Sequence, residues 1–186
     1  TSPDYEMHIK GKWRHQGEEN NTDVQAKLYV HALAQSLKRF NITPVVEAHT
    51  GDVFLSGSWP GMLFDFSLAS IKGHMTMNFK DGRISHLSPE TEEKLGLGKL
   101  LSILSLQTIP RRLKLDFSDL AHNGYSFDRF KGGFILKKGI MSTTDSYIDG
   151  PVAYAGIKGD LDLVRQRYNL ELRVSPHITA SLPVVA

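Results

Sequence analysis

Apolar and polar residues alternate along most of this 186-residue chain, and this period of two is its strongest constraint on folding. Met75, Met77 and Phe79 alternate with polar residues in the run 74–80, and the pattern returns at 112–117 and 168–174. Each such strand has one apolar face, which the sheet must hide. The pattern predicts a mainly β (α+β) fold: a curved antiparallel meander of roughly eight to ten strands, with two short helical insertions and an apolar concave face.

Turn signals divide the alternating runs. Pro60-Gly61, Asp81-Gly82 and Asn123-Gly124 predict turns, and the polar stretch 17–23 predicts another. The runs that favour extended structure lie at 5–13, 24–30, 45–59, 64–68, 74–80, 112–117, 126–134, 134–141, 146–150, 153–160 and 168–175. Because no linker interrupts the series, residues 1–186 are expected to form a single domain.

Two segments change from strand to helical periodicity. Leu33, Leu37 and Phe40 form the stripe of a short amphipathic helix at 32–40, which Asn41 and Pro44 end. The second helix begins at Ser88-Pro89 and ends before Pro110. One of its faces carries Leu97, Leu100, Leu101 and Leu104.

The second helix must be covered, because the segment 95–109 holds eight Leu and Ile residues. It either closes the open end of the sheet or also meets a lipid interface. Arg111 and Arg112 follow the helix, where phosphate headgroups would lie at such an interface. We predict them as headgroup ligands and Leu97, Leu100, Leu101 and Leu104 as a membrane-contacting or gating face.

The apolar sheet face allows two interpretations. It is either an ordinary sandwich core or the floor of a groove for acyl chains. Under the second interpretation, the predicted groove residues are Phe64, Phe66, Leu68, Met75, Met77, Phe79, Leu113, Leu115 and Phe117.

The sequence offers little for other functions. A net charge of +2, with Arg111, Arg112 and Lys114 as the only tight basic group, argues against nucleic acid as a partner. The chain has no cysteine, and its eight histidines lack metal-ligand spacing, so we predict no metal and no cofactor. Asp116, Asp119 and Asp128 lie on a polar face or beside a turn rather than in a catalytic pair. We therefore predict no enzymatic activity and no catalytic residues.

Several motifs resemble one known family. They are Trp59-Pro60-Gly61, Gly98-Lys99-Leu100-Leu101, Leu104-Ser105-Leu106-Gln107, the run 110–117 (PRRLKLDF), Phe127-Asp128-Arg129-Phe130, Gly150-Pro151-Val152-Ala153 and Ser181-Leu182-Pro183. Together they resemble the C-terminal region of the YhdP family, AsmA-like proteins of the Gram-negative envelope. The helix-to-strand motif around Arg111 is the most specific of them.

The resemblance implies a role in lipid movement. It implies a fragment of a longer protein that is anchored in the inner membrane and crosses the periplasm as a curled sheet with an apolar groove. The expected partners are phospholipid, the membrane on the outer-membrane side and other envelope proteins. The first hypothesis is therefore a terminal module of a bridge-like lipid transporter. The alternative is a closed β-sandwich that serves as an assembly or docking module without lipid transport.

Overall fold

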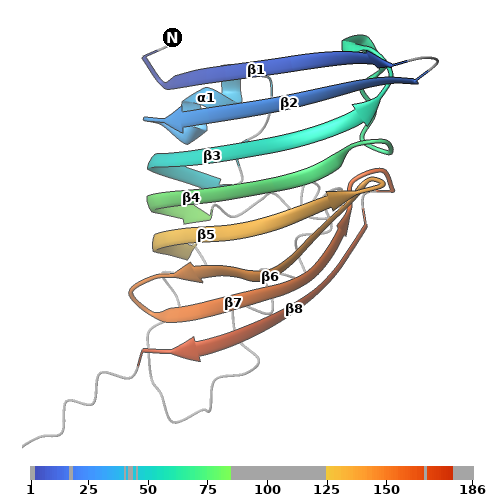
Figure 1. Cartoon of the computed structure of the whole chain (residues 1–186). Coiled ribbons are helices and arrows are strands. Elements are labelled where there is room, and N and C mark those ends of the chain that lie inside the picture. The colour runs from blue at the N-terminus through green and yellow to red at the C-terminus, as the bar shows by residue number, and fades with distance from the viewer. Residues whose placement is uncertain are drawn as a thin grey trace, which may run out of the picture.

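The described part of the chain forms one antiparallel β-sheet. The computed structural model describes residues 3–16, 19–39, 41, 44, 46–84, 125–165 and 167–177. Eight strands lie in the sheet in the order of the sequence, and each is antiparallel to its neighbours (Figure 1). They are β1 (Tyr5–Gln16), β2 (Glu19–Val30), β3 (Val46–Pro60), β4 (Lys72–Ile84), β5 (Tyr125–Lys137), β6 (Ile140–Asp149), β7 (Ala153–Asp162) and β8 (Arg167–Pro176). The predicted β meander is confirmed.

The first predicted helix is confirmed as α1 (Leu33–Arg39), which packs beside β3. Leu33 is buried on the apolar side of the sheet. Arg39 fixes the end of the helix through its Nε, which lies 2.6 Å from Asp4 Oδ2. The second predicted helix, at 88–109, and the strand predicted at 112–117 lie outside the described residues.

The strand predicted at 64–68 is wrong, because this segment forms the connection between β3 and β4. It contains the single-turn 3-10 helix η1 (Leu63–Asp65). Gly61 has a φ of 99°, and the Asp65 carboxylate accepts a hydrogen bond from the Met62 backbone N–H over 2.7 Å. These local bonds compete with strand pairing, which the alternation alone did not reveal.

The hairpin predicted at Asp81-Gly82 is also wrong, because β4 continues through both residues. Asp81 has a φ of 50° within the strand. Two successive exposed residues occur here, at 80–81, and also at 49–50 in β3 and 128–129 in β5. In each of these three neighbouring strands, two consecutive residues are exposed, so the residue numbers that face the apolar side change from even to odd or from odd to even at this point.

Other strand boundaries also differ from the prediction. The polar stretch 17–23 is not a long turn, because Gln16 pairs with Glu19. Residues 126–137 lie in one strand, and the β5–β6 turn falls at Lys138-Gly139, where φ is 54° and 78°. Two consecutive positive φ angles are typical of the tight turns that match strand twist.

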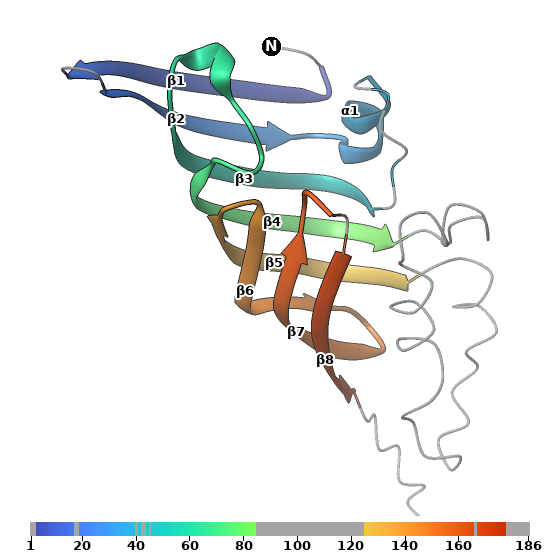
Figure 2. The same cartoon turned by 90° about the vertical axis from the view of Figure 1, so that its right-hand side faces the viewer.

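The last strands of the sheet curl toward the side on which α1 lies (Figure 2). Register shifts interrupt the β5–β6 pairing between Lys131 and Ile135, and the β6–β7 pairing between Thr143 and Ser146. Irregularities of this kind bend a strand and increase its local twist. They account for the change in direction from β5 to β8.

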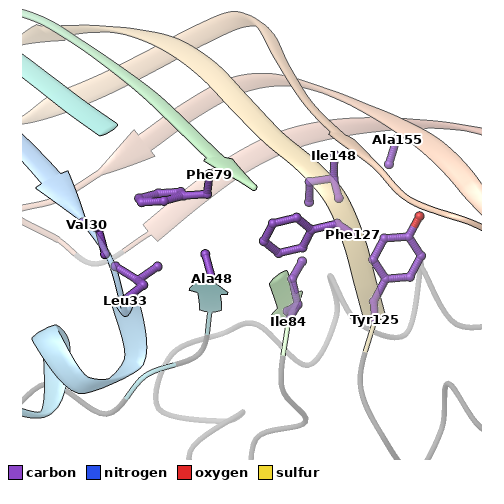
Figure 3. Packing of buried hydrophobic residues seen from close by; sticks show 9 residues of the cluster. All are labelled: Val30, Leu33, Ala48, Phe79, Ile84, Tyr125, Phe127, Ile148 and Ala155. Atoms are coloured by element: carbon purple, nitrogen blue, oxygen red, sulfur yellow. The ribbon is translucent and has the colours of Figure 1, made fainter. Parts of the chain in front are cut away.

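The buried core lies at the end of the sheet that α1 covers. Figure 3 shows side chains from α1 and from β2 to β7 meeting there. The cluster consists of Val30, Leu33, Ala48, Phe79, Ile84, Tyr125, Phe127, Ile148 and Ala155. Its polar member is satisfied, because the Tyr125 hydroxyl donates to the Ala153 carbonyl over 2.6 Å.

We predict that Tyr125→Phe destabilises the fold by about 0.5–1.5 kcal/mol, because the Ala153 carbonyl loses one of its two donors and keeps the Gly150 N–H at 3.2 Å. Burial raises the pKa of the Tyr125 phenol, so the neutral hydroxyl is favoured in the folded state. The stabilisation from the neutral Tyr125 hydroxyl is present below the pKa of Tyr125 in the unfolded chain. It is lost as the pH rises through the higher pKa of Tyr125 in the folded protein. Urea unfolding at neutral pH measures the effect. Tyr154→Phe, at an exposed position on the outer face of β7, is the control and should change stability little.

Candidate functional site

The face of the sheet that bears α1 is apolar along its whole width. Strand register places directly opposed residues on one face. Ile9, Ala26, Leu55, Met75 and Phe134 are opposed in sequence from β1 to β5. They form an apolar row that runs across the strands.

A second row lies beside the first. Met7, Leu28, Val53, Met77 and Gly132 are opposed across the same five strands. On the later strands the same face continues with Ile157 opposite Leu172 and Ala155 opposite Val174. The apolar face is therefore continuous from one edge of the sheet to the other.

Burial of this face is uneven. At the α1 end, Val30 and Phe127 are each 2% exposed, and at the opposite end Trp59 and Ile71 are 5% and 4% exposed. Between them, Leu55, Met75 and Met77 are half-buried. On the edge strand β1, Met7 and Ile9 are 46% and 59% exposed. The middle of the face is thus only partly covered by the described residues and presents apolar surface.

Two buried hydroxyl groups on this face are already paired. Thr143 Oγ1 and Ser146 Oγ lie 2.6 Å apart within the β6 irregularity. Asp145, between them, turns to the outer face, where it accepts a hydrogen bond from the Gly133 N–H over 3.2 Å. The face therefore presents hydrocarbon and satisfied hydroxyls to whatever contacts it.

The opposite face of the sheet is polar. Arg14 and Asp23 form an ion pair across β1 and β2, and Asn78 donates to Asp52 across β4 and β3. Shallow hollows on this face are lined mainly by such residues. The contrast between the two faces assigns the apolar side as the candidate site.

The predicted site residues fall into three groups. Met75, Met77 and Phe79 lie on the apolar face of β4, but Phe79 belongs to the buried core while the two methionines are half-buried. Phe64, Phe66 and Leu68 lie in the β3–β4 connection instead of the sheet. The remaining predicted residues lie outside the described part of the chain: Leu97, Leu100, Leu101, Leu104, Arg111, Arg112, Leu113, Leu115 and Phe117.

The predicted site left out most of the strands that build the face. Leu28, Leu55 and Leu172 belong to the same surface as Met75. Their strands show the same alternation, but alternation alone does not reveal which strands lie beside one another. The register supplies that information.

The described residues show no cluster suited to binding a metal ion. Within these ranges, no group of three or more His, Asp or Glu side chains is placed to hold a metal ion. The pKa of Asp162 is lowered, chiefly by the hydrogen bond from the Arg165 backbone N–H, which caps the β7–β8 turn. No helix in the described part of the chain has the length and apolar character needed to cross a bilayer.

Comparison with known proteins identifies the family of this chain. The family model described as YhdP protein matches residues 1–186. The chain belongs to the YhdP family. It is 27% identical over 176 residues to the intermembrane phospholipid transporter YhdP of Escherichia coli (strain K12). This alignment covers 95% of the chain but 14% of that protein. No solved structure matches the chain.

The uneven burial predicts unequal effects of truncation along the apolar face. Phe127→Ala should cost about 3–5 kcal/mol, because it opens a cavity in the closed cluster. Met75→Ala should cost less than about 2 kcal/mol, since part of that side chain already contacts solvent. Chemical unfolding of both variants measures the difference. Equal large losses would show that the middle of the face is packed like the α1 end.

Proposed function

We propose that this domain shields phospholipid acyl chains on the apolar face of its sheet. The observation that carries the proposal is the pair of continuous apolar rows across β1–β5, whose central members are half-buried. The E. coli relative is named as an intermembrane phospholipid transporter, which supports phospholipid as the ligand.

The mechanism is passive. Each methylene that leaves water for an apolar surface gains about 0.8 kcal/mol, so a row of Leu, Val and Met side chains can replace water around an acyl chain. Met75 and Met77 are unbranched and adapt to chains of irregular shape. Because the rows run across the strands, the acyl chain would move from strand to strand. No bond is broken, so the domain acts without catalysis.

The cellular setting belongs to the same proposal. The domain would be the terminal module of a bridge-like transporter in the Gram-negative periplasm, anchored in the inner membrane and carrying lipid toward the outer membrane. Family membership supports this setting, and the chain spans 14% of the length of the E. coli relative.

The alternative of a closed sandwich used for docking has less support. A sandwich needs two sheets packed face to face. The described strands form one sheet, in which β1 and β8 are the two edges. Its buried cluster covers the α1 end and leaves the middle of the face half-buried.

Photo-cross-linking tests the proposal directly. A photoreactive residue at position 75 should capture phospholipid, whereas one at position 76, on the polar face of the same strand, should not.

Native mass spectrometry of the purified domain should show co-purified phospholipid. Met75→Asp should reduce its amount about tenfold or more, because a carboxylate replaces apolar surface in the row.

Thr76→Asp is the matched control, since it adds the same charge to the exposed face. Circular dichroism checks that both variants keep the sheet. Absence of lipid capture at positions 55, 75 and 172 in a folded domain would contradict the proposal.

A further inference from the structure

The β3–β4 connection exposes an unusual amount of apolar surface. Met62, Leu63, Phe66 and Leu68 are 50%, 54%, 50% and 43% exposed, and Phe64 is 92% exposed. A soluble surface seldom gathers so many large apolar side chains in one short loop without a partner. We call the segment 62–68 the apolar loop.

The apolar loop is held in a defined conformation. The Trp59 indole N–H donates to the Met62 carbonyl over 3.0 Å, and the Phe66 ring meets the Trp59 ring edge-on at 5.2 Å. Thr22 Oγ1 donates to the Gly61 carbonyl over 2.9 Å, which ties the start of the loop to β2. Asp65, the one acidic residue of the loop, caps the Met62 N–H. Phe64 is therefore presented outward on a fixed turn.

The loop lies at the opposite end of the sheet from α1 (Figures 1 and 2). Its last residues approach the β5–β6 turn, because a Cβ built on Gly139 would lie 3.5 Å from the Leu68 carbonyl oxygen and close to the Val164 side chain. Val164 is itself 54% exposed. The turns at this end thus extend the apolar surface beyond the loop.

Basic residues accompany this surface. Lys137 and Lys138 are exposed at the β5–β6 turn, and Lys72 is exposed at the start of β4. Among the described residues these three lysines form no ion pair. A protruding apolar tip with lysines behind it is the arrangement that favours a bilayer interface, where the apolar side chains enter the acyl boundary and the cations meet anionic headgroups.

We propose that the apolar loop inserts into the surface of a phospholipid bilayer and docks this end of the sheet on the membrane. This proposal rests on the proposed function, because docking this end of the sheet on the membrane would bring lipid to the apolar rows. It deepens that function by naming the element that touches the membrane. The loop joins the rows through Trp59, whose indole lies on the apolar face.

Fluorescence at position 64 tests the insertion. The chain has no cysteine, so Phe64→Cys introduces one site for an environment-sensitive dye. Vesicles of phosphatidylethanolamine and phosphatidylglycerol should shift its emission to the blue. The control is Tyr29→Cys, a residue 44% exposed on the outer face of β2 near the α1 end, where no shift is expected.

Vesicle flotation gives the matching affinity test. Phe64→Asp should weaken binding about tenfold or more, because an aromatic ring that inserts into the bilayer is replaced by a charge. Tyr29→Asp, at the α1 end, should bind like the parent. High salt should weaken the parent's binding through the lysines. Equal binding of both variants, or no emission shift at position 64, would overturn the insertion.

The outcomes separate this inference from the proposed function. If position 75 captures lipid but position 64 gives no shift, the insertion is wrong and the shielding face stands. If position 64 shifts but the face captures no lipid, the docking stands without the transport role. An emission shift that requires an added envelope protein instead of vesicles would overturn the insertion in favour of a protein partner.

Discussion

The structure depends on how a single layer of strands covers its own apolar face. Two packed sheets would bury that face completely, but the described strands form one sheet. The chain closes one end with α1 and a cluster centred on Val30 and Phe127, and the other end with Trp59 and Ile71. The half-buried middle follows from this division. Among the described residues, burial is therefore concentrated at the two ends of the strands, and this division is the basis of the proposed lipid-shielding role.

Much of the fold could be predicted from the sequence, because alternation reports local structure directly. The strand around Met75 and the helix at Leu33–Arg39 are examples. Turn-forming residues were less reliable as predictors of where strands end. Asp81-Gly82 has the composition of a hairpin turn but lies within β4, where the neighbouring strands hold it in the ladder. Residues 64–68 alternate like a strand, yet Asp65 and Trp59 hold a turn there through hydrogen bonds.

The site was less predictable than the fold. Sequence periodicity shows that Leu55 and Met75 each face an apolar side, but strand register is needed to show that they are direct neighbours. The position of Phe64 also could not be predicted from periodicity alone. Its spacing predicts a sheet residue, whereas its 92% exposure places it at the tip of a loop. In both cases the missing information was tertiary, because alternation carries no record of pairing partners or of burial.

The sequential strand order has a consequence for how such a sheet changes in evolution. Each of the eight described strands pairs with its neighbours in the order β1 to β8, so no crossover occurs among them. A hairpin gained or lost would lengthen or shorten the sheet by two strands, and the apolar faces of the remaining strands would stay on the same side of the sheet. The span of a domain built this way is therefore adjustable in steps of roughly 10 Å, twice the spacing between neighbouring strands.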